Sequence, residues 1–245
     1  MPGRDTEVVN WDEQRLSFGP AAGLYDRVRP RYPVPALRWM LGARPVKVVD
    51  LGAGTGILTR QLLDLGHEVL PVEPDAGMRA ALDQATPGIR SQAGSAEEIP
   101  LPDGAVDAVV AGQAYHWFNR GRAHPEIARV LKPGGVFAPV WNDRDERVEW
   151  LTELSALVDD VHGHEDLEIT SFGEWFGPVE QADFEFSVPH TPDSVVELMR
   201  SRSYYLTAGP ERQRRIDEGV RSIAARNGEE FPLPYVTHAF RAAKR

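Results

Sequence analysis

The segment VKVVDLGAGTG, residues 46–56, restricts the possible folds of this chain more than any other feature. An apolar, β-branched run ends in Asp50, glycines alternate at Gly52, Gly54 and Gly56, and the helix-like segment ILTRQLLDLG follows directly. A buried strand, a tight turn and a helix start in this order bring the backbone close to a bound nucleotide. Glycine is favoured there because a Cβ atom would obstruct both the turn and the ligand.

Strand-like and helix-like segments alternate along the following residues. We expect strands at 46–51, 68–73, near 89, at 105–113 and at 136–141, with helices at 57–66, 75–85 and 121–131. Helices of this length between strands predict parallel βαβ units. Later segments predict helices at 150–161, 194–206 and 212–227 and strands at 184–190 and 235–243. The helix at 194–206 is expected to be opened by Thr191, Pro192 and Asp193. No shift of composition marks a second domain, so we expect one α/β domain with added helices.

Charge and composition limit the compartment and the partners. The formal net charge is −10, and the densest basic run, RQRR at 212–215, is flanked by acids, so no face suited to a nucleic-acid backbone stands out. No stretch approaches the roughly 20 apolar residues of a membrane span, and the N-terminus has no apolar signal region. The absence of cysteine excludes disulfides and thiolate metal sites. We expect a cytoplasmic protein without nucleic-acid or membrane partners.

The glycine segment resembles that of a known enzyme family. Its GxGxG spacing is one residue shorter than the GxGxxG of NAD-binding proteins, which argues against NAD. It resembles the signature of class I S-adenosylmethionine (SAM) methyltransferases, in which an acid precedes the glycines as Asp50 does here. EVLPVE, AGSAEEIPLPDG, AGQAYHWFNR and RVLKPGGVF resemble the next four motifs in order, and GLYDRVRPRYP resembles the family's N-terminal cap. The chain is most similar to small-molecule methyltransferases with a methyltransferase type 11 domain.

This resemblance implies both an architecture and a division of the chain. The sheet is expected to be Rossmann-like and doubly wound, mostly parallel, seven-stranded, with an antiparallel hairpin strand near the end and helical cap and lid additions. Residues 1–245 are expected to form a single SAM-dependent methyltransferase domain. Its core would span about 46–141, its cap about 1–45, and its lid helices and last two strands about 142–245.

The resemblance also implies which residues hold SAM. They are Asp50, Gly52, Ala53, Gly54, Gly56, Glu73, Met78, Ser95, Ala96, Glu97, Gln113, Ala114 and Tyr25. Glu73 closes the second strand, where an acid can accept hydrogen bonds from both ribose hydroxyls; the alternative is an acid that favours the next helix start. Met78 either packs on the adenine or belongs to the core. Ser95 stands where the family usually has Asp, so Glu97 is a second candidate for the adenine edge.

Two further segments are expected to complete the pocket. Gln113 and Ala114 match positions that line the methionine part of SAM in the resembled family. Tyr25 is the expected cap contact, and Arg29 or Arg31 is either a carboxylate clamp or part of a solvent-facing loop.

His116 is the candidate catalytic base, because it follows the carboxyl end of the predicted strand at 105–113, at the edge where open α/β sheets bind ligands. An unperturbed histidine titrates near physiological pH and could take a proton from a hydroxyl or amine. The alternative is an aromatic floor formed together with Tyr115, Trp117 and Phe118. The metal-like run HGHED at 162–166 is interpreted as a polar turn, since Gly163 interrupts any helix that would align the ligands. No metal is expected.

The resemblance therefore implies methyl transfer from SAM to a small-molecule acceptor, on oxygen or nitrogen, with S-adenosylhomocysteine (SAH) as product. Aromatic residues in the cap and the late helices suit an enclosed small-molecule cavity. Two alternatives remain open at this point: an NAD(P)-linked oxidoreductase, and a SAM-binding protein without transferase activity.

Overall fold

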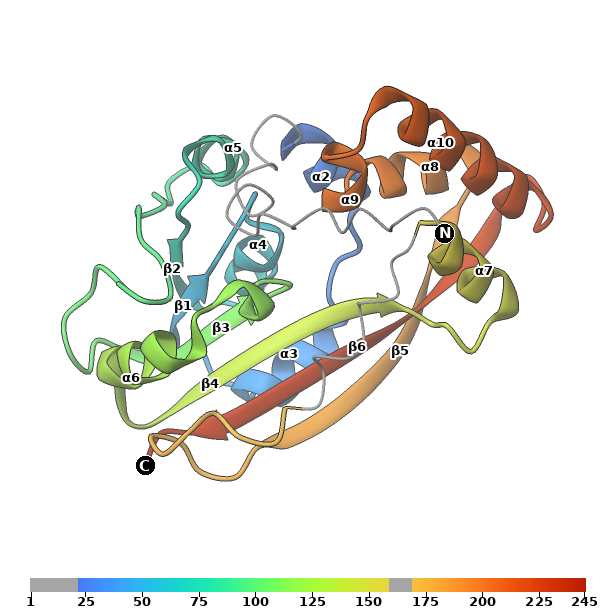
Figure 1. The fold of residues 1–245 in the computed structure, drawn as a ribbon. Helices are drawn as coiled ribbons and strands as arrows, with labels where there is room; N and C mark the ends of the chain where they lie inside the picture. Colours follow the sequence, from blue (N-terminus) through green and yellow to red (C-terminus); the bar gives the residue numbers. More distant parts are fainter. Residues whose placement is uncertain (1–21, 159–168) are drawn as a thin grey trace, which may run out of the picture.

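A six-stranded sheet of order β2-β1-β3-β4-β6-β5 forms the centre of the computed structural model, which describes residues 22–158 and 169–245 (Figure 1). The strands are β1 (Lys47–Leu51), β2 (Glu68–Val72), β3 (Val106–Gly112), β4 (Leu131–Arg144), β5 (Glu180–His190) and β6 (Phe231–Ala243). Strands β1 to β4 pair in parallel, whereas β6 pairs antiparallel with both β4 and β5. The predicted Rossmann-like, mostly parallel sheet with an antiparallel hairpin strand is confirmed.

The predicted count of seven strands is wrong for the described residues. The segment near Ile89 does not form a strand and contributes only an isolated bridge between Val72 and Gln92. The Asp83 carboxylate accepts hydrogen bonds from the backbone N–H and the hydroxyl of Ser91, both at 2.8 Å. These bonds tie the segment to the preceding helix, so one bridge remains where a longer ladder was expected.

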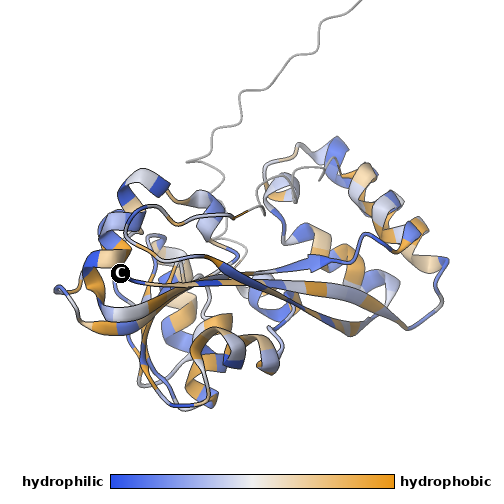
Figure 2. Cartoon of the chain, turned by 90° about the horizontal axis from the view of Figure 1, so that it is seen from below, coloured by the Kyte–Doolittle hydropathy of each residue, from blue (hydrophilic) through white to orange (hydrophobic). Residues whose placement is uncertain are grey.

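Helices lie on both sides of the sheet (Figure 2). They are α2 (Ala22–Val28), α3 (Val34–Leu41), α4 (Ile57–Asp64), α5 (Ala76–Ala85), α6 (Arg120–Val130), α7 (Glu149–Leu157), α8 (Pro192–Arg200), α9 (Ser203–Leu206) and α10 (Pro210–Ala225), with a 3₁₀ turn at Tyr115–Trp117. None of the helices in these two ranges is long and apolar enough to cross a membrane.

Alternate residues of the central strands supply the two faces of the core. Val48 packs with α3 and α4, while its neighbour Val49 packs with α6 and the segment 169–177 on the opposite face. This alternation follows from the two-residue period of a strand. Both faces are apolar because a parallel sheet with helices on each side is shielded from water on both.

A separate hydrophobic cluster lies at the carboxyl end of β4, where α7, α8 and α10 pack against the first residues of β6. Helix α8 begins at the predicted place: the Thr191 hydroxyl accepts from the Ser194 N–H, and the Ser194 hydroxyl accepts from the Thr191 N–H. Such a reciprocal cap satisfies two donors that a helix start leaves unpaired. The cluster gives the late helices their own core beyond the end of the strand.

Candidate functional site

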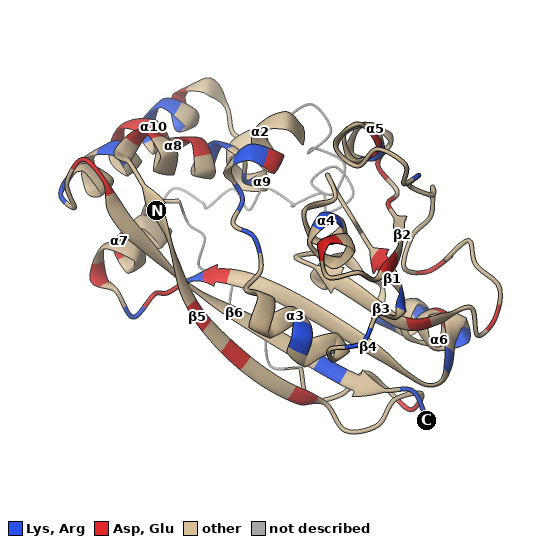
Figure 3. Cartoon of the chain, turned by 180° about the vertical axis from the view of Figure 1, so that it is seen from behind, with Lys and Arg blue, Asp and Glu red and all other residues tan. Residues whose placement is uncertain are grey.

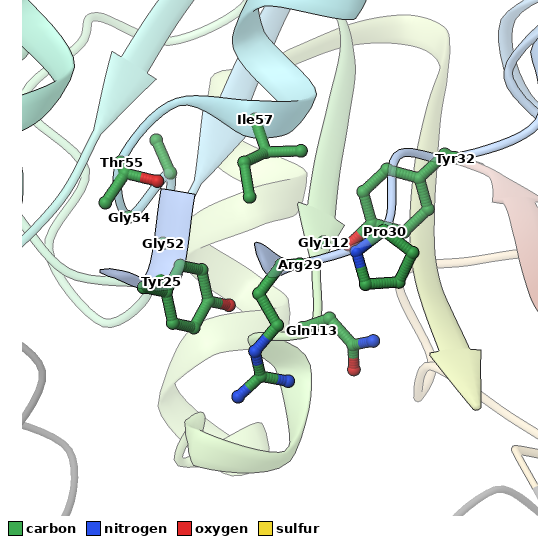
Figure 4. Close-up of a pocket in the computed structure, with 11 residues that line it drawn as sticks. Tyr25, Arg29, Pro30, Tyr32, Gly52, Gly54, Thr55, Ile57, Gly112 and Gln113 are labelled. Carbon is green, nitrogen blue, oxygen red and sulfur yellow. The ribbon is translucent and has the colours of Figure 1, made fainter. Parts of the chain in front are cut away.

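A pocket opens where β1 and β3 end, between the glycine loop (residues 52–56) and the cap segment (residues 22–33) (Figure 4). Its lining is Tyr25, Arg29, Pro30, Tyr32, Gly52, Ala53, Gly54, Thr55, Ile57, Gly112 and Gln113. The strand order reverses here, since β2 lies on one side of β1 and β3 on the other. The carboxyl edge of an open α/β sheet at such a switch point is the usual ligand crevice.

The three glycines of the loop have different steric roles. A Cβ atom on Gly52 would lie 2.7 Å from the Ala114 Cβ, and one on Gly56 would lie 2.8 Å from the Leu82 Cγ. A Cβ atom on Gly54 would meet no protein atom within 4 Å, although Gly54 lines the pocket. Gly52 and Gly56 thus allow close packing within the protein, whereas Gly54 leaves open space on the ligand side. The pocket fits a cofactor that approaches the backbone at Gly54.

Glu73 links the end of β2 to the glycine loop. Its Oε2 accepts from the Gly54 N–H at 2.9 Å and its Oε1 accepts from the Asp75 N–H at 2.8 Å. Burial raises the pKa of Glu73, and the two backbone hydrogen bonds oppose that rise. Each oxygen keeps a second lone pair, so the carboxylate could still accept from ribose hydroxyls. Its ribose role stays a prediction.

Asp50 is a deeply buried carboxyl group below the loop. Its Oδ2 accepts from the Thr59 hydroxyl at 2.6 Å, while its Oδ1 has no hydrogen-bond partner within residues 22–158 and 169–245. Burial raises the pKa of Asp50 to about 7, and the nearby charge of Glu73 acts in the same direction. A buried polar atom without a partner is costly, and it is common where a ligand completes the bonding.

Gln113 has a strained backbone at the end of β3. It is the one non-glycine residue of the described ranges with a positive φ, 56°. Its Nε2 donates to the Asn142 carbonyl at 2.8 Å, and the Asn142 Nδ2 donates to the carbonyls of Pro30 and Arg31, each at 3.3 Å. Strained backbone of this kind persists where the surroundings fix it, typically at functional sites. Here it connects the sheet to the cap segment.

The cap segment is held against the glycine loop by polar contacts. The Asp26 Oδ1 accepts from the Thr55 hydroxyl at 2.8 Å and pairs with the Arg60 guanidinium at 2.5 Å. The Arg29 guanidinium lies over the Tyr25 ring, 4.7 Å from its centroid. The cap segment thereby covers one side of the pocket.

His116 is exposed and is not among the residues that line the pocket. Its Nδ1 accepts from the Trp141 Nε1 at 3.4 Å, so a neutral ring in this arrangement carries its proton on Nε2. Its neighbour Tyr115 is buried, and the Tyr115 hydroxyl lies 2.8 Å from the Nε2 of His124 within a cluster of aromatic rings. Tyr115 therefore packs within an aromatic cluster. The role of His116 as a base stays a prediction.

The predicted adenine segment makes contacts within the protein. The Ser95 Oγ accepts from the Glu97 N–H at 3.2 Å, and the Glu97 Oε1 accepts from the Asn119 N–H at 2.8 Å. Ala96 is buried in the core. These contacts fix the loop against α6, and its adenine contacts stay a prediction.

Part of the predicted set meets in one pocket. Tyr25, Gly52, Ala53, Gly54 and Gln113 line it, together with Arg29. The other predicted residues do not line it; these are Asp50, Gly56, Glu73, Met78, Ser95, Ala96, Glu97, Ala114, His116 and the alternative clamp Arg31.

Sequence reasoning missed five residues that line the pocket: Pro30, Tyr32, Thr55, Ile57 and Gly112. Thr55 lies between Gly54 and Gly56, and Ile57 directly follows Gly56, so the glycine motif itself could have indicated both residues. Tyr32 lies in the predicted cap segment. Its contact with the pocket depends on hydrogen bonds between its backbone and the Gln61 side chain, at 2.9 and 2.7 Å. No local sequence pattern predicts those hydrogen bonds.

Asp50 should make stability depend on pH in the ligand-free protein. Its folded pKa of about 7 lies above the ordinary aspartate value of 3.8, so the folded state keeps a proton that the unfolded state releases between these values. Stability contributed below pH 4 is therefore lost as the pH rises towards 7. In the wild type, the free energy of unfolding should fall by about 4 kcal/mol at most over this range, and Asp50→Asn should abolish this decrease. Urea unfolding from pH 4 to 8 measures both. Asp64→Asn, at the exposed end of α4, is the control; equal pH profiles for wild type and Asp50→Asn would contradict the assignment.

Comparison with known proteins identifies the family. A profile described as a methyltransferase domain matches residues 49–138. An uncharacterized methyltransferase of Mycobacterium tuberculosis is 41% identical over 235 residues, which cover 94% of this chain and 96% of that protein. A malonyl-[acyl-carrier protein] O-methyltransferase of Methylococcus capsulatus is 34% identical over 148 residues, 56% of this chain and 53% of that protein.

Among solved structures, a candidate type II methyltransferase from Anaeromyxobacter dehalogenans superimposes with a TM-score of 0.61 at 26% identity, covering 89% of this chain and 97% of that one. Sheet order, glycine loop and pocket position agree with this relationship. The chain belongs to the class I SAM-dependent methyltransferases, and SAM is its cofactor.

Proposed function

We propose that this methyltransferase acts on a small organic acceptor, on oxygen or nitrogen, held between the cap segment and the carboxyl edge of the sheet. The observation that carries the proposal is the closed position of the cap. Asp26 bonds both Thr55 of the glycine loop and Arg60 of α4, so that the cap segment covers the pocket. A macromolecular acceptor would need an open groove at this place, whereas an enclosed pocket suits a small ligand.

The distribution of charge supports the same class of acceptor. Arginines are interleaved with Asp and Glu on α8 and α10 (Figure 3). Arg200 pairs with Asp217 at 2.6 Å, and Arg221 pairs with Asp193. Binding to a phosphate backbone requires a continuous positive surface, whereas these two pairs place carboxylates directly against the charges of Arg200 and Arg221.

The residues proposed to hold SAM are those that the resemblance assigned, with Gly54 and Glu73 foremost. SAM supplies a methyl group on a positively charged sulfur. The open space at Gly54 allows the backbone to approach a ligand, and the lone pairs of Glu73 suit two hydroxyl groups. Tyr25 and Tyr32 close the pocket on the cap side and would exclude water. Alignment and exclusion of water supply most of what a methyl transfer needs from the protein.

An oxygen acceptor has additional support. The relative from Methylococcus capsulatus is named as an O-methyltransferase, and it matches 148 residues, 56% of this chain. If the acceptor were a hydroxyl or amine, a base would take its proton, and His116 is the proposed base in that case. An acceptor that is already ionised would need none.

We also propose that the chain is divided into a core, a cap and a lid region. Residues 1–245 form one SAM-dependent methyltransferase domain with a core at about 46–141, a cap at about 1–45 and a lid region at about 142–245. The separate hydrophobic cluster of α7, α8 and α10 supports a distinct lid, and the continuous pairing of β4 with β6 supports a single domain.

Gly54→Ala should weaken SAH binding at least tenfold, because its Cβ would project into space that the cofactor uses. Gly104→Ala is a matched control. Gly104 has a similar φ, 59° against 55°, and its added Cβ also meets no protein atom within 4 Å, but it does not line the pocket. Both variants carry the same backbone cost. Calorimetry with SAH decides, and equal affinities for the two variants would show that Gly54 serves the turn alone.

The acceptor class can be tested with labelled SAM. We expect methyl transfer to members of a small-molecule panel and none to tRNA, DNA or folded proteins. Arg38→Gln, a change at an exposed position of α3, should leave the pattern unaltered. Transfer to tRNA or to a protein without transfer to any small molecule would refute the proposal, and SAH binding without any transfer would favour a SAM-binding protein that is not a transferase.

A further inference from the structure

Two arginines, Arg29 and Arg202, meet where the cap segment reaches the turn between α8 and α9. The Arg29 Nε donates to the Ser201 Oγ and its Nη2 donates to the Ser201 carbonyl, both at 3.0 Å. Arg202 follows Ser201 directly in the chain. The Arg29 side chain lines the pocket and extends between Tyr25 and Gln113 (Figure 4). This corner therefore joins the pocket to the lid helices.

Neither guanidinium has a carboxylate partner among residues 22–158 and 169–245. Arg29 bonds only neutral groups of Ser201, whereas Arg200, two residues before Arg202, pairs with Asp217 at 2.6 Å. Burial lowers the pKa of Arg29 to about 10, and the charge of Arg202 adds to this effect. Two positive charges placed together without a counter-ion repel each other, and an anion between them would relieve that repulsion.

Two buried donors at the same corner have no hydrogen-bond acceptor within the described ranges. These are the Tyr235 hydroxyl, on a side chain that is 1% exposed, and the Nε of Arg202. Tyr235 pairs with Arg144 across β4 and β6 and packs in one cluster with Met199 and Tyr204, which flank the turn that holds Ser201 and Arg202. The charges of Arg202, Arg144 and Arg29 lower the pKa of Tyr235 against the larger effect of its burial. A buried donor without an acceptor is unfavourable, so the described part of the chain leaves these two donors for an acceptor group that a ligand could supply.

We propose that Arg29, Arg202 and the Tyr235 hydroxyl bind an anionic group, a carboxylate or a phosphate, of the methyl acceptor. Guanidinium groups bind such planar or tetrahedral oxyanions through paired N–H donors, and a phenolic hydroxyl adds a further donor. The acceptor is then a small organic anion whose charged end lies between cap and lid, with the rest of the molecule in the pocket beside the glycine loop. This inference rests on the proposed small-molecule acceptor and narrows it.

The test measures binding of small ligands to the full chain saturated with SAH. The probes are short carboxylic acids and phosphate monoesters, each matched with its neutral amide or its free alcohol, and affinities are measured by calorimetry. We expect at least one anion to bind at least tenfold more tightly than its neutral partner. Arg202→Gln should remove this preference, Tyr235→Phe should reduce it, and Arg38→Gln should leave it unchanged.

Each outcome is decisive once thermal unfolding and SAH affinity show that the variants are folded. Neutral compounds that bind as tightly as the anions would refute the anion site but leave the small-molecule proposal standing. A wild-type protein that binds no small molecule of either charge would refute both. Equal affinities of Arg202→Gln and Arg38→Gln for the preferred anion would also refute the site. Preferential binding of the carboxylic acids or of the phosphate monoesters tells whether the acceptor's anionic group is a carboxylate or a phosphate.

Discussion

The hydrogen bond from the Gly54 N–H to the Glu73 Oε2 joins the ends of two adjacent strands, and the form of the pocket depends on it. It fixes the glycine loop at the place where the sheet order reverses, so that the crevice opens on the same side as Gln113. The cap segment binds this fixed loop through Asp26 and Thr55. Because Glu73 is buried, its two backbone hydrogen bonds also offset the cost of keeping a carboxylate out of water.

Most of the sheet could be predicted from the sequence, because its signals are local. β-branched runs, alternating glycines and the Thr191 cap each specify their own segment, and the order of segments specifies parallel pairing. The seventh strand could not be excluded in this way, since the contact of Asp83 with Ser91 that replaces its ladder is a tertiary choice. A pattern of apolar residues does not reveal which polar side chain will take a backbone N–H.

The site was predicted where a motif carries it and missed where distant segments meet. The glycine loop and Gln113 come from contiguous motifs, although the positive φ of Gln113 had no signal in the sequence. The contact of Arg29 with Ser201 joins residues that are 172 positions apart. Sequence alone suggested Arg29 as a clamp but offered no means of finding Arg202 or Tyr235 beside it. Periodicity reports the face that a residue occupies and not its partner across the fold.

The cap and the sheet are stabilised by different kinds of interaction, and this difference suits a catalytic cycle. Helix α2 buries a single residue, Ala22, whereas β1 buries four of its five residues and β3 five of its seven. Helix α2 depends on hydrogen bonds and on the partly exposed ion pairs of Asp26 with Arg60 and Arg27 with Glu197, each worth about 1 kcal/mol. The sheet depends on apolar burial worth about 25 cal/mol per Å² over many side chains. Helix α2 can therefore open for SAM to enter and SAH to leave while the sheet that positions the glycine loop stays intact.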